Sequence, residues 1–245
     1  MRTVTEQLTA PELCVLLPAY NEAKHLPTTL TGIYQVLVRA GIAHNVLVVN
    51  DHSTDESVSV LEALKDQIPT LGYVNNAYGQ GFGNTVRYGL DHWKGDVVAI
   101  VMADASDSPE DLLTYYRTFC TSQVDCVFGS RFLPGSSVAG YPAQKLFFNR
   151  SFNLLVRGLV DWRFNDFTNA FKLYRREVID SCRPYQSHNF SLTLEIPLKA
   201  LSKGFTYTTV PIGWTQRKYG HSNLNLWRNA RAYLAILSQY LLHRL

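Results

Sequence analysis

Residues 99–112, AIVMADASDSPEDL, form an apolar run that ends on four carboxylates, those of Asp104, Asp107, Glu110 and Asp111. Hard divalent cations such as Mg²⁺ and Mn²⁺ prefer oxygen ligands. They often use one or two carboxylates together with substrate phosphates and water. Asp104 and Asp107, which come first after the apolar run, are therefore candidate metal ligands.

The same segment also has the composition of a helix start. Ser106 or Ser108 can cap the first turn, Pro109 is tolerated there, and Glu110 and Asp111 place negative charge near the amino end. For Glu110 and Asp111 we favour this structural explanation over metal binding.

Apolar, β-branched runs predict buried strands of a parallel sheet at residues 14–20, 45–51 and 96–104. Helical patterns lie between them at residues 21–41 and 54–68. Later in the chain, alternation over 205–214 predicts another strand, and 220–245 has helical spacing. Alternating strands and helices predict an α/β fold with a parallel sheet.

Ligands of open parallel sheets bind outside the carboxyl ends of the strands. The residues that end the first three strands should share one rim: Pro18, Tyr20, Glu22, Asp51 and Asp104. Acids from three strands on one rim suggest a ligand with ribose hydroxyls, a metal, or both. The alternative is that these polar residues only solvate turns.

Gly79, Gly81 and Gly83 precede a further helical pattern. Glycines allow close approach of the backbone to a ligand, and a helix start favours an anion. The spacing is not that of the dinucleotide-binding motif, and a plain loop is the alternative interpretation.

The composition is that of a globular protein, with 245 residues, 46% apolar residues and a net charge of +3. This charge is too small for a nucleic-acid-binding protein, although the basic last third fits an anionic partner. The four cysteines match no zinc pattern, so we expect reduced thiols in a cytoplasmic protein. No apolar run reaches the ~20 residues needed to span a bilayer.

The order of the motifs is more specific than any one of them. It runs LLPAYNE, VVNDHSTDES, NAYGQGFGNTVRYGL, KGDVVAIVMADASDSPEDL, FGSRF, NDFTNAFKLYRREV and VPIGWTQRKYGHSNL. From about Cys14 to Leu226 the chain resembles the family 2 glycosyltransferases of GT-A fold, most closely the dolichyl- or polyprenyl-phosphate mannosyl- and glucosyltransferases. The resemblance implies a Rossmann-like, mostly parallel sheet flanked by helices in residues 1–225, followed by an amphipathic helix at 226–245.

On the donor side the resemblance implies that the nucleotide sugar is bound by Pro18, Tyr20, Glu22, Asp51, Gly81, Arg87 and Ala103. The metal motif of the family, usually Asp-Ala-Asp, is here Met102-Ala103-Asp104. Asp104 is then the principal ligand of Mg²⁺ or Mn²⁺, with Asp107 as a helper. Metal affinity without the donor should be weak.

On the acceptor side the resemblance implies that Arg131, Arg150, Lys218 and Ser222 meet a phosphate. Bidentate arginines suit a lipid phosphate, and the apolar helical segment around Arg150 suits its tail. The alternative is an ordinary amphipathic helix with solvated charges. Asn223 stands where the family usually has Lys.

Catalytic roles are implied for Asp104, Arg131, Asp166, Glu195 and Arg217. Asp166 or Glu195 could take a proton from a hydroxyl acceptor, whereas a phosphate acceptor is already an anion and needs little help from a base. Glu195 lies in an apolar helical pattern, so a surface position without a role is its alternative.

The leading hypothesis is an inverting, metal-dependent enzyme that moves a hexose from GDP-mannose or UDP-glucose to polyprenyl phosphate at the cytoplasmic membrane face. One alternative acceptor is a soluble or glycolipid hydroxyl. Another alternative is a catalytically weak nucleotide-sugar-binding protein, suggested by Met102. The helix at 226–245 either lies on a lipid interface or packs on the sheet or on a second subunit, as in a homodimer.

Overall fold

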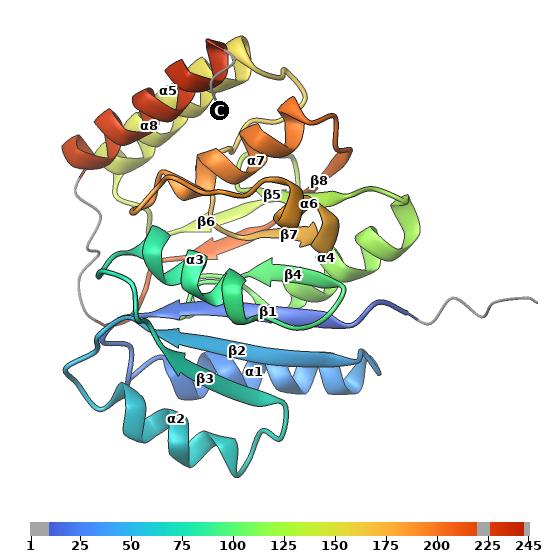
Figure 1. Ribbon diagram of the computed structural model, residues 1–245, viewed down its shortest axis with the longest axis vertical. Helices are drawn as coiled ribbons and strands as arrows, with labels where there is room; N and C mark the ends of the chain where they lie inside the picture. The colour runs from blue at the N-terminus through green and yellow to red at the C-terminus, as the bar shows by residue number, and fades with distance from the viewer. Residues whose placement is uncertain (1–9, 220–225, 243–245) are drawn as a thin grey trace, which may run out of the picture.

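A seven-stranded sheet forms the centre of the computed structural model, which describes residues 10–219 and 226–242 (Figure 1). Its strands are β1 (Leu13–Ala19), β2 (His44–Asn50), β3 (Leu71–Asn75), β4 (Val97–Ile100), β5 (Cys126–Ser130), β7 (Lys172–Arg175) and β8 (Tyr207–Pro211). Their spatial order is β3-β2-β1-β4-β7-β5-β8, and β7 alone is antiparallel to its neighbours β4 and β5. A short parallel pair, β6 (Ser137–Ala139) and β9 (Gly213–Thr215), lies beside the sheet.

Helices cover both faces of the sheet, as a mostly parallel sheet requires. One face packs against α1 (Leu26–Arg39), α2 (Ser57–Lys65) and α4 (Pro109–Ser122). The other packs against α3 (Phe82–His92), α5 (Ala143–Leu159), α6 (Arg176–Ser181), α7 (Leu192–Ser202) and α8 (Leu226–Leu241) (Figure 1). The expected α/β architecture is confirmed.

Strand β1 joins the two halves of the core because all seven of its residues are buried. Leu13, Val15 and Leu17 belong to the cluster under α1 and α4, whereas Cys14 and Leu16 belong to the cluster on the opposite face. This alternation follows from the two-residue period of a strand. The result is a continuous apolar run with no polar position, as the sequence shows.

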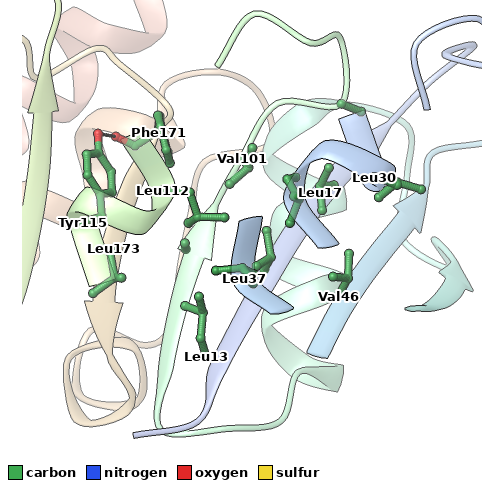
Figure 2. Close-up of a cluster of buried hydrophobic side chains, with 14 of the residues drawn as sticks. Leu13, Leu17, Leu30, Leu37, Val46, Val101, Leu112, Tyr115, Phe171 and Leu173 are labelled. Carbon is green, nitrogen blue, oxygen red and sulfur yellow. Dashed lines mark hydrogen bonds between the residues drawn. The ribbon is translucent and has the colours of Figure 1, made fainter. Parts of the chain in front are cut away.

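A buried tyrosine links α4 to the segment before β7 (Figure 2). Tyr115 is fully buried, and its hydroxyl donates to the carbonyl oxygen of Phe171 at 2.8 Å. A buried hydroxyl needs such a partner, and the rings of Tyr115 and Phe171 also stack at 4.2 Å between centroids. The contact fixes the position of the chain just before it enters the sheet.

The third predicted strand is shorter than expected, since β4 ends at Ile100. Beyond it, the Asp107 carboxylate accepts from the Met102 amide at 3.0 Å, and Asp104 accepts from the Ser106 amide at 3.2 Å. Side chains that bond the local backbone compete with a strand ladder. Asp104 therefore lies on a turn rather than at a strand end.

Two further expectations concern α4 and the strand predicted at 205–214. Helix α4 begins as expected, with Ser108 accepting from the Glu110 amide and Pro109 in the first turn. The predicted strand is divided into β8 and β9. The Asp111 carboxylate accepts from the Gly213 amide at 2.7 Å, which fixes the chain where the division occurs.

The carboxyl-terminal helix is part of the folded unit. Ile236 and Leu237 of α8 are buried in the core cluster on the α7 side of the sheet, and Tyr233 packs against Phe152 of α5. Within the described ranges, no helix combines the length and apolar character that crossing a bilayer would require.

Candidate active site

A guanidinium bridges two of the predicted acids at the rim of the sheet. Arg217 Nη2 donates to Glu22 Oε1 at 2.7 Å and to Asp104 Oδ2 at 2.8 Å, while its Nε donates to the same Asp104 oxygen at 3.1 Å. Glu22 follows β1, Asp104 follows β4, and Arg217 follows β9. Burial lowers the pKa of the Arg217 guanidinium, but Asp104 and Glu22 together outweigh it and raise the pKa above its ordinary value, so the group stays charged.

His25 fastens the segment that carries Arg217, and the sequence analysis did not identify it. Its Nδ1 lies 2.7 Å from Glu22 Oε2, and its Nε2 accepts from the Tyr219 amide at 3.2 Å. Because Nε2 accepts, Nδ1 carries the proton and donates to Glu22. Residues 217–219 are thereby held over the LLPAYNE motif, and the three-residue spacing from Glu22 to His25 was the available signal.

Asp51, the third predicted acid of the rim, makes its hydrogen bonds to Asn76 and to the glycine segment. It is buried, its Oδ2 accepts from the Gly81 amide at 2.9 Å, and its Oδ1 accepts from Asn76 at 2.8 Å. Its own amide donates to Ala19 of β1 at 2.7 Å. Asp51 therefore ties the end of β2 to both β1 and the glycine segment, with Asn76 as a partner that the sequence did not indicate.

The glycines of this segment are explained by packing within the chain. A Cβ on Gly83 would lie 2.6 Å from Ser187 O and from His188 C, and one on Gly81 would lie 2.8 Å from His188 O. Gly81 also has a φ of +135°, which favours glycine. The close approach expected toward a ligand is thus made toward residues 187–189, and Arg87 on α3 lies beside them with Nη1 3.3 Å from His188 Nδ1.

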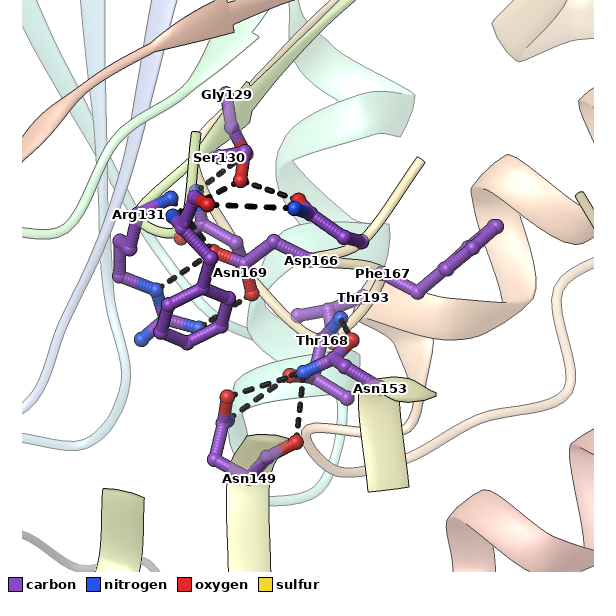
Figure 3. Close-up of polar contacts among 12 residues, drawn as sticks. Gly129, Ser130, Arg131, Asn149, Asn153, Asp166, Phe167, Thr168, Asn169 and Thr193 are labelled. Carbon is purple, nitrogen blue, oxygen red and sulfur yellow. Dashed lines mark hydrogen bonds and ion pairs between the residues drawn. The ribbon is translucent and has the colours of Figure 1, made fainter. Parts of the chain in front are cut away.

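A buried ion pair lies at the opposite side of the rim (Figure 3). Arg131, just after β5, donates from Nε to Asp166 Oδ2 at 2.8 Å and from Nη2 to Asp166 Oδ1 at 2.7 Å. The Arg131 amide donates to Asp166 as well, at 3.0 Å, and Asp166 is fully buried. Such a pair offsets the cost of removing two charges from water only when its geometry is this complete.

Helix α5 is anchored to the same turn (Figure 3). Asn153 donates to Thr168 Oγ1 at 2.8 Å and accepts from the Thr168 amide at 3.2 Å. This contact places Arg150 of α5 near Arg131: the guanidinium carbons of the two arginines lie 5.0 and 5.4 Å from the ring centroid of Phe132. Two cations, one from the end of β5 and one from the middle of α5, therefore converge on one aromatic ring.

Glu195 is buried and holds a turn, so the alternative interpretation, that it is a surface acid without a role, is wrong. Its two oxygens accept from the amides of Gln186 and Ser187, both at 2.8 Å, and Lys199 lies 2.8 Å from Oε1. The apolar pattern around Glu195 reflects a helix buried on all sides. A carboxylate buried in such a helix needs a partner of opposite charge, and Lys199, four residues later in the helix, is that partner.

The remaining predicted residues are spread along the rim. Pro18 lies buried within β1, Tyr20 follows it, and the Ala103 carbonyl accepts from Thr29 of α1 at 3.1 Å. Lys218 is exposed beside Arg217. Ser222 lies outside the described residues.

Asp107 lines a cavity of about 530 Å³ between α1, α4 and the β8–β9 connection. Its side chain is buried, and burial is the main cause that raises its pKa to about 7, with the nearby Asp104 charge acting in the same direction. Its Oδ2 is bonded to the Met102 amide. These features suit Asp107 less well than Asp104 as a ligand of a divalent cation.

Asp104 is the candidate metal ligand that the motif indicates at this rim. No set of three or more His, Cys, Asp or Glu side chains converges anywhere in residues 10–219 and 226–242. The Asp104 carboxylate nevertheless faces a cation, the Arg217 guanidinium, so its position accommodates positive charge. Mg²⁺ or Mn²⁺ held by one carboxylate and the phosphates of a substrate fits this arrangement.

A doubly covered, mostly parallel sheet with one reversed strand, an acidic rim and a glycine segment is the architecture of the GT-A class of α/β proteins. The chain belongs to glycosyl transferase family 2, whose model matches residues 14–183. It is therefore a glycosyltransferase, and the family and fold expected from the motifs are confirmed.

Two characterised relatives match most of the chain. Polyprenol monophosphomannose synthase of Mycolicibacterium smegmatis is 28% identical over 218 residues, which is 86% of this chain and 80% of that protein. Undecaprenyl-phosphate mannosyltransferase of Micrococcus luteus is 24% identical over 216 residues, or 86% of each chain.

The fold is also that of solved glycosyltransferase structures. Glucosyl-3-phosphoglycerate synthase of Mycobacterium tuberculosis in complex with UDP has a TM-score of 0.72 and 15% identity, covering 94% of this chain and 80% of that one. The same enzyme solved with Mn²⁺, UDP-glucose and phosphoglyceric acid has a TM-score of 0.72 and 14% identity, with the same coverage.

Gly83→Ala should destabilise the protein although alanine is the better helix former. In the first turn of α3, alanine gains at most about 1 kcal/mol over glycine, but its Cβ would meet the fixed backbone of residues 187–189, which costs about 2–3 kcal/mol. We expect the free energy of unfolding, measured by urea denaturation, to fall by roughly 1–2 kcal/mol. Gly72→Ala in β3, where a Cβ meets nothing within 4 Å, is the control and should leave stability within about 0.5 kcal/mol. Equal stability of the two variants would contradict the packing argument.

Asp107→Asn should change the pH dependence of stability in the metal-free protein. The pKa of Asp107 is about 7 when folded and about 3.9 when unfolded, so the wild type loses stability as pH rises between these values. Asparagine keeps an acceptor for the Met102 amide but carries no charge. The advantage of the variant in free energy of unfolding should therefore grow by about 3 kcal/mol from pH 4.5 to pH 8.

Urea denaturation at pH 4.5, 6 and 8 measures this difference. Asp66→Asn, at the exposed carboxyl end of α2, is the control and should follow the wild type at each pH. An advantage of Asp107→Asn that stays constant with pH would show that Asp107 is ionised throughout.

Proposed function

We propose that this enzyme transfers a hexose, with mannose from GDP-mannose as the first choice over glucose from UDP-glucose, to polyprenyl phosphate with inversion. The reaction depends on Mg²⁺ or Mn²⁺ and takes place at the cytoplasmic membrane face. The two relatives, a polyprenol monophosphomannose synthase and an undecaprenyl-phosphate mannosyltransferase, support the choice of sugar and acceptor.

The hydrogen bonds of Asp166 and Glu195, the two carboxylates expected to act as a base, are the observation that supports a phosphate acceptor. Both oxygens of Asp166 are engaged by Arg131, and both oxygens of Glu195 are engaged by backbone amides. A hydroxyl acceptor needs a base, whereas a phosphate is already an anion near neutral pH. Asp166 is better suited to positioning Arg131, and Glu195 to positioning the turn at residues 186–187.

Arg131 and Arg150 are the residues that we assign to the acceptor phosphate. Asp166 fixes the Arg131 guanidinium, and the ring of Phe132 lies against both guanidinium groups, so two cations are presented in a defined geometry. Planar guanidinium groups bind phosphate oxygens in pairs. The exposed apolar side chains of α5 next to Arg150 suit the isoprenoid chain that the phosphate carries.

On the donor side the nucleotide lies along the ends of β1 and β2, where Asp51 and the Gly81 segment form the wall. When bound, the divalent cation on Asp104 stabilises the negative charge that develops on the departing nucleoside diphosphate. Arg217, which contacts Asp104 and Glu22, is placed to transfer its hydrogen bonds to the same diphosphate. Arg87 adds positive charge at the α3 side of the wall.

The reaction is a single in-line displacement. An oxygen of the acceptor phosphate forms a bond to the anomeric carbon while the bond from that carbon to the diphosphate oxygen breaks, and the electron pair leaves with the nucleoside diphosphate. The chain supplies position and fixed positive charge on both sides of the sugar.

Donor binding should depend on metal and on Asp104. Calorimetric titration of GDP-mannose, UDP-glucose and UDP-N-acetylglucosamine, each with Mn²⁺ and with chelator, should show metal-dependent binding of one donor. In Asp104→Asn, which keeps an oxygen for Arg217 but loses the charge, the metal-dependent gain in affinity should fall roughly 100-fold. Asp66→Asn is the charge-matched control, and it should bind as the wild type does.

Two results would contradict this assignment. Undiminished metal-dependent binding by Asp104→Asn would remove Asp104 from its role as the metal ligand. The absence of binding of every donor to the wild type would favour the non-catalytic alternative.

Arg150→Ala should weaken the acceptor site without affecting the donor. Loss of a hydrogen bond to a charged group corresponds to a rise of about tenfold or more in KM for polyprenyl phosphate, with donor affinity unchanged. Arg117→Ala, on the exposed side of α4, is the control. Transfer to a soluble hydroxyl acceptor, with none to polyprenyl phosphate, would overturn the proposed acceptor.

A further inference from the structure

The exposed apolar side chains of the described residues gather on two helices. Nine of the twelve large hydrophobic residues that are exposed lie on α5, on α8 or directly after them: Phe147, Phe148, Leu154, Leu155, Leu159, Trp162, Leu234, Leu241 and Leu242. Phe147 and Trp162 expose 68% and 65% of their surface, which is uncommon for such side chains in a soluble protein. We call these nine residues the α5–α8 surface.

The residues on α5 form one stripe. Phe147 and Phe148 are followed seven residues later, after about two turns, by Leu154 and Leu155, and then by Leu159, so the five share one side of the helix, and Trp162 follows its end. The opposite side of α5 provides Asn153 and Val156, which are buried. The buried side of α5 therefore makes the contacts with the core, and the exposed apolar stripe takes no part in them.

Helix α8 has the same division and lies beside α5 (Figure 1). Ile236 and Leu237 are buried in the core, whereas Leu234 and Leu241 are about half exposed. The rings of Phe152 on α5 and Tyr233 on α8 are 5.3 Å apart and join the two helices. Together α5 and α8 form the outermost layer on their face of the molecule.

Apart from Asp161, which precedes Trp162 and pairs with Arg163, the charges of this layer are positive. Residues 143–160 and 226–242 contain no Asp or Glu. Lys145, Arg150 and Arg157 lie on α5, and Arg231 is exposed on α8. Basic side chains around an apolar stripe match a surface with negative headgroups above an apolar interior.

We propose that the α5–α8 surface docks on the anionic leaflet of a lipid bilayer, with both helices lying in the plane of the interface. The inference rests on the proposed lipid acceptor, because it places Arg150 and the neighbouring Arg131 at the depth of lipid phosphates. The apolar stripe enters the boundary between headgroups and acyl chains, and the arginines remain at the headgroups.

A second copy of the chain is a poorer occupant of this surface. A twofold contact would bring the basic residues of two α5 helices toward one another, with no acid on either helix to pair with them. An anionic leaflet provides the opposite charge over the whole layer. The expected occupant is therefore lipid.

Flotation with vesicles tests this inference without any transfer reaction. The full chain should bind vesicles of phosphatidylcholine with 30% phosphatidylglycerol and should bind phosphatidylcholine vesicles much more weakly. The double variant Phe147→Ser/Leu154→Ser should lose about tenfold or more in partition coefficient. Arg231→Gln should lose about fivefold on the anionic vesicles. Val38→Ser, half exposed on α1 at the other face of the sheet, is the control and should bind as the wild type does.

Thermal unfolding and calorimetric donor titration of each variant establish that the fold and the donor site are intact. Equal binding of the double variant and the wild type, or no binding of the wild type to anionic vesicles, would overturn the proposal. A dimer in light scattering that the double variant converts to a monomer would overturn it in favour of a second copy. Transfer to detergent-solubilised polyprenyl phosphate is measured separately, so loss of docking alone leaves the proposed function standing.

Discussion

The reversed direction of β7 is the constraint on which the two-sided site depends. In a fully parallel sheet only the segments after each strand reach the ligand-binding rim. Because β7 enters between β4 and β5 from the other direction, the turn before it, with Asp166 and Asn169, arrives at that rim instead. Asp166 is fully buried there and requires a cation, which the end of β5 provides in Arg131. The position of α5, anchored through Asn153 to the same turn, follows from this pairing.

The parallel half of the fold could be predicted because its signals are local. The first two strands match their apolar runs to within a residue, and α4 has its expected cap. Strand β7 could not be recognised, because its four residues include Lys172, which is buried and donates from Nζ to the carbonyl oxygens of Phe167 and Thr193. The direction of β7 is decided by its pairing with β5, more than 40 residues away in sequence, and with β4, more than 70 residues away.

The candidate site was predictable in its residue types and not in its pairings. The acids at the strand ends follow from the rule for parallel sheets, and they lie at the rim as expected. Their partners do not follow: Arg217 is 195 positions from Glu22, and Gly81 is 30 from Asp51. A single sequence shows which groups can ionise, but burial and the tertiary contacts decide whether a carboxylate such as Glu195 faces substrate or holds a turn.

The Arg217 bridge has a consequence for the order in which ligands arrive. A divalent cation that came alone would compete with the guanidinium for Asp104 and remove one of its two carboxylate partners, Glu22 being the other. A diphosphate that came alone would face the carboxylates of Glu22 and Asp104. If the two arrived as a chelate, Asp104 would hold the cation and Arg217 would bind the diphosphate, so the carboxylate and the guanidinium would each keep a partner of opposite charge. On the proposed metal and donor assignment, the bridge therefore favours the metal–nucleotide complex over either component alone.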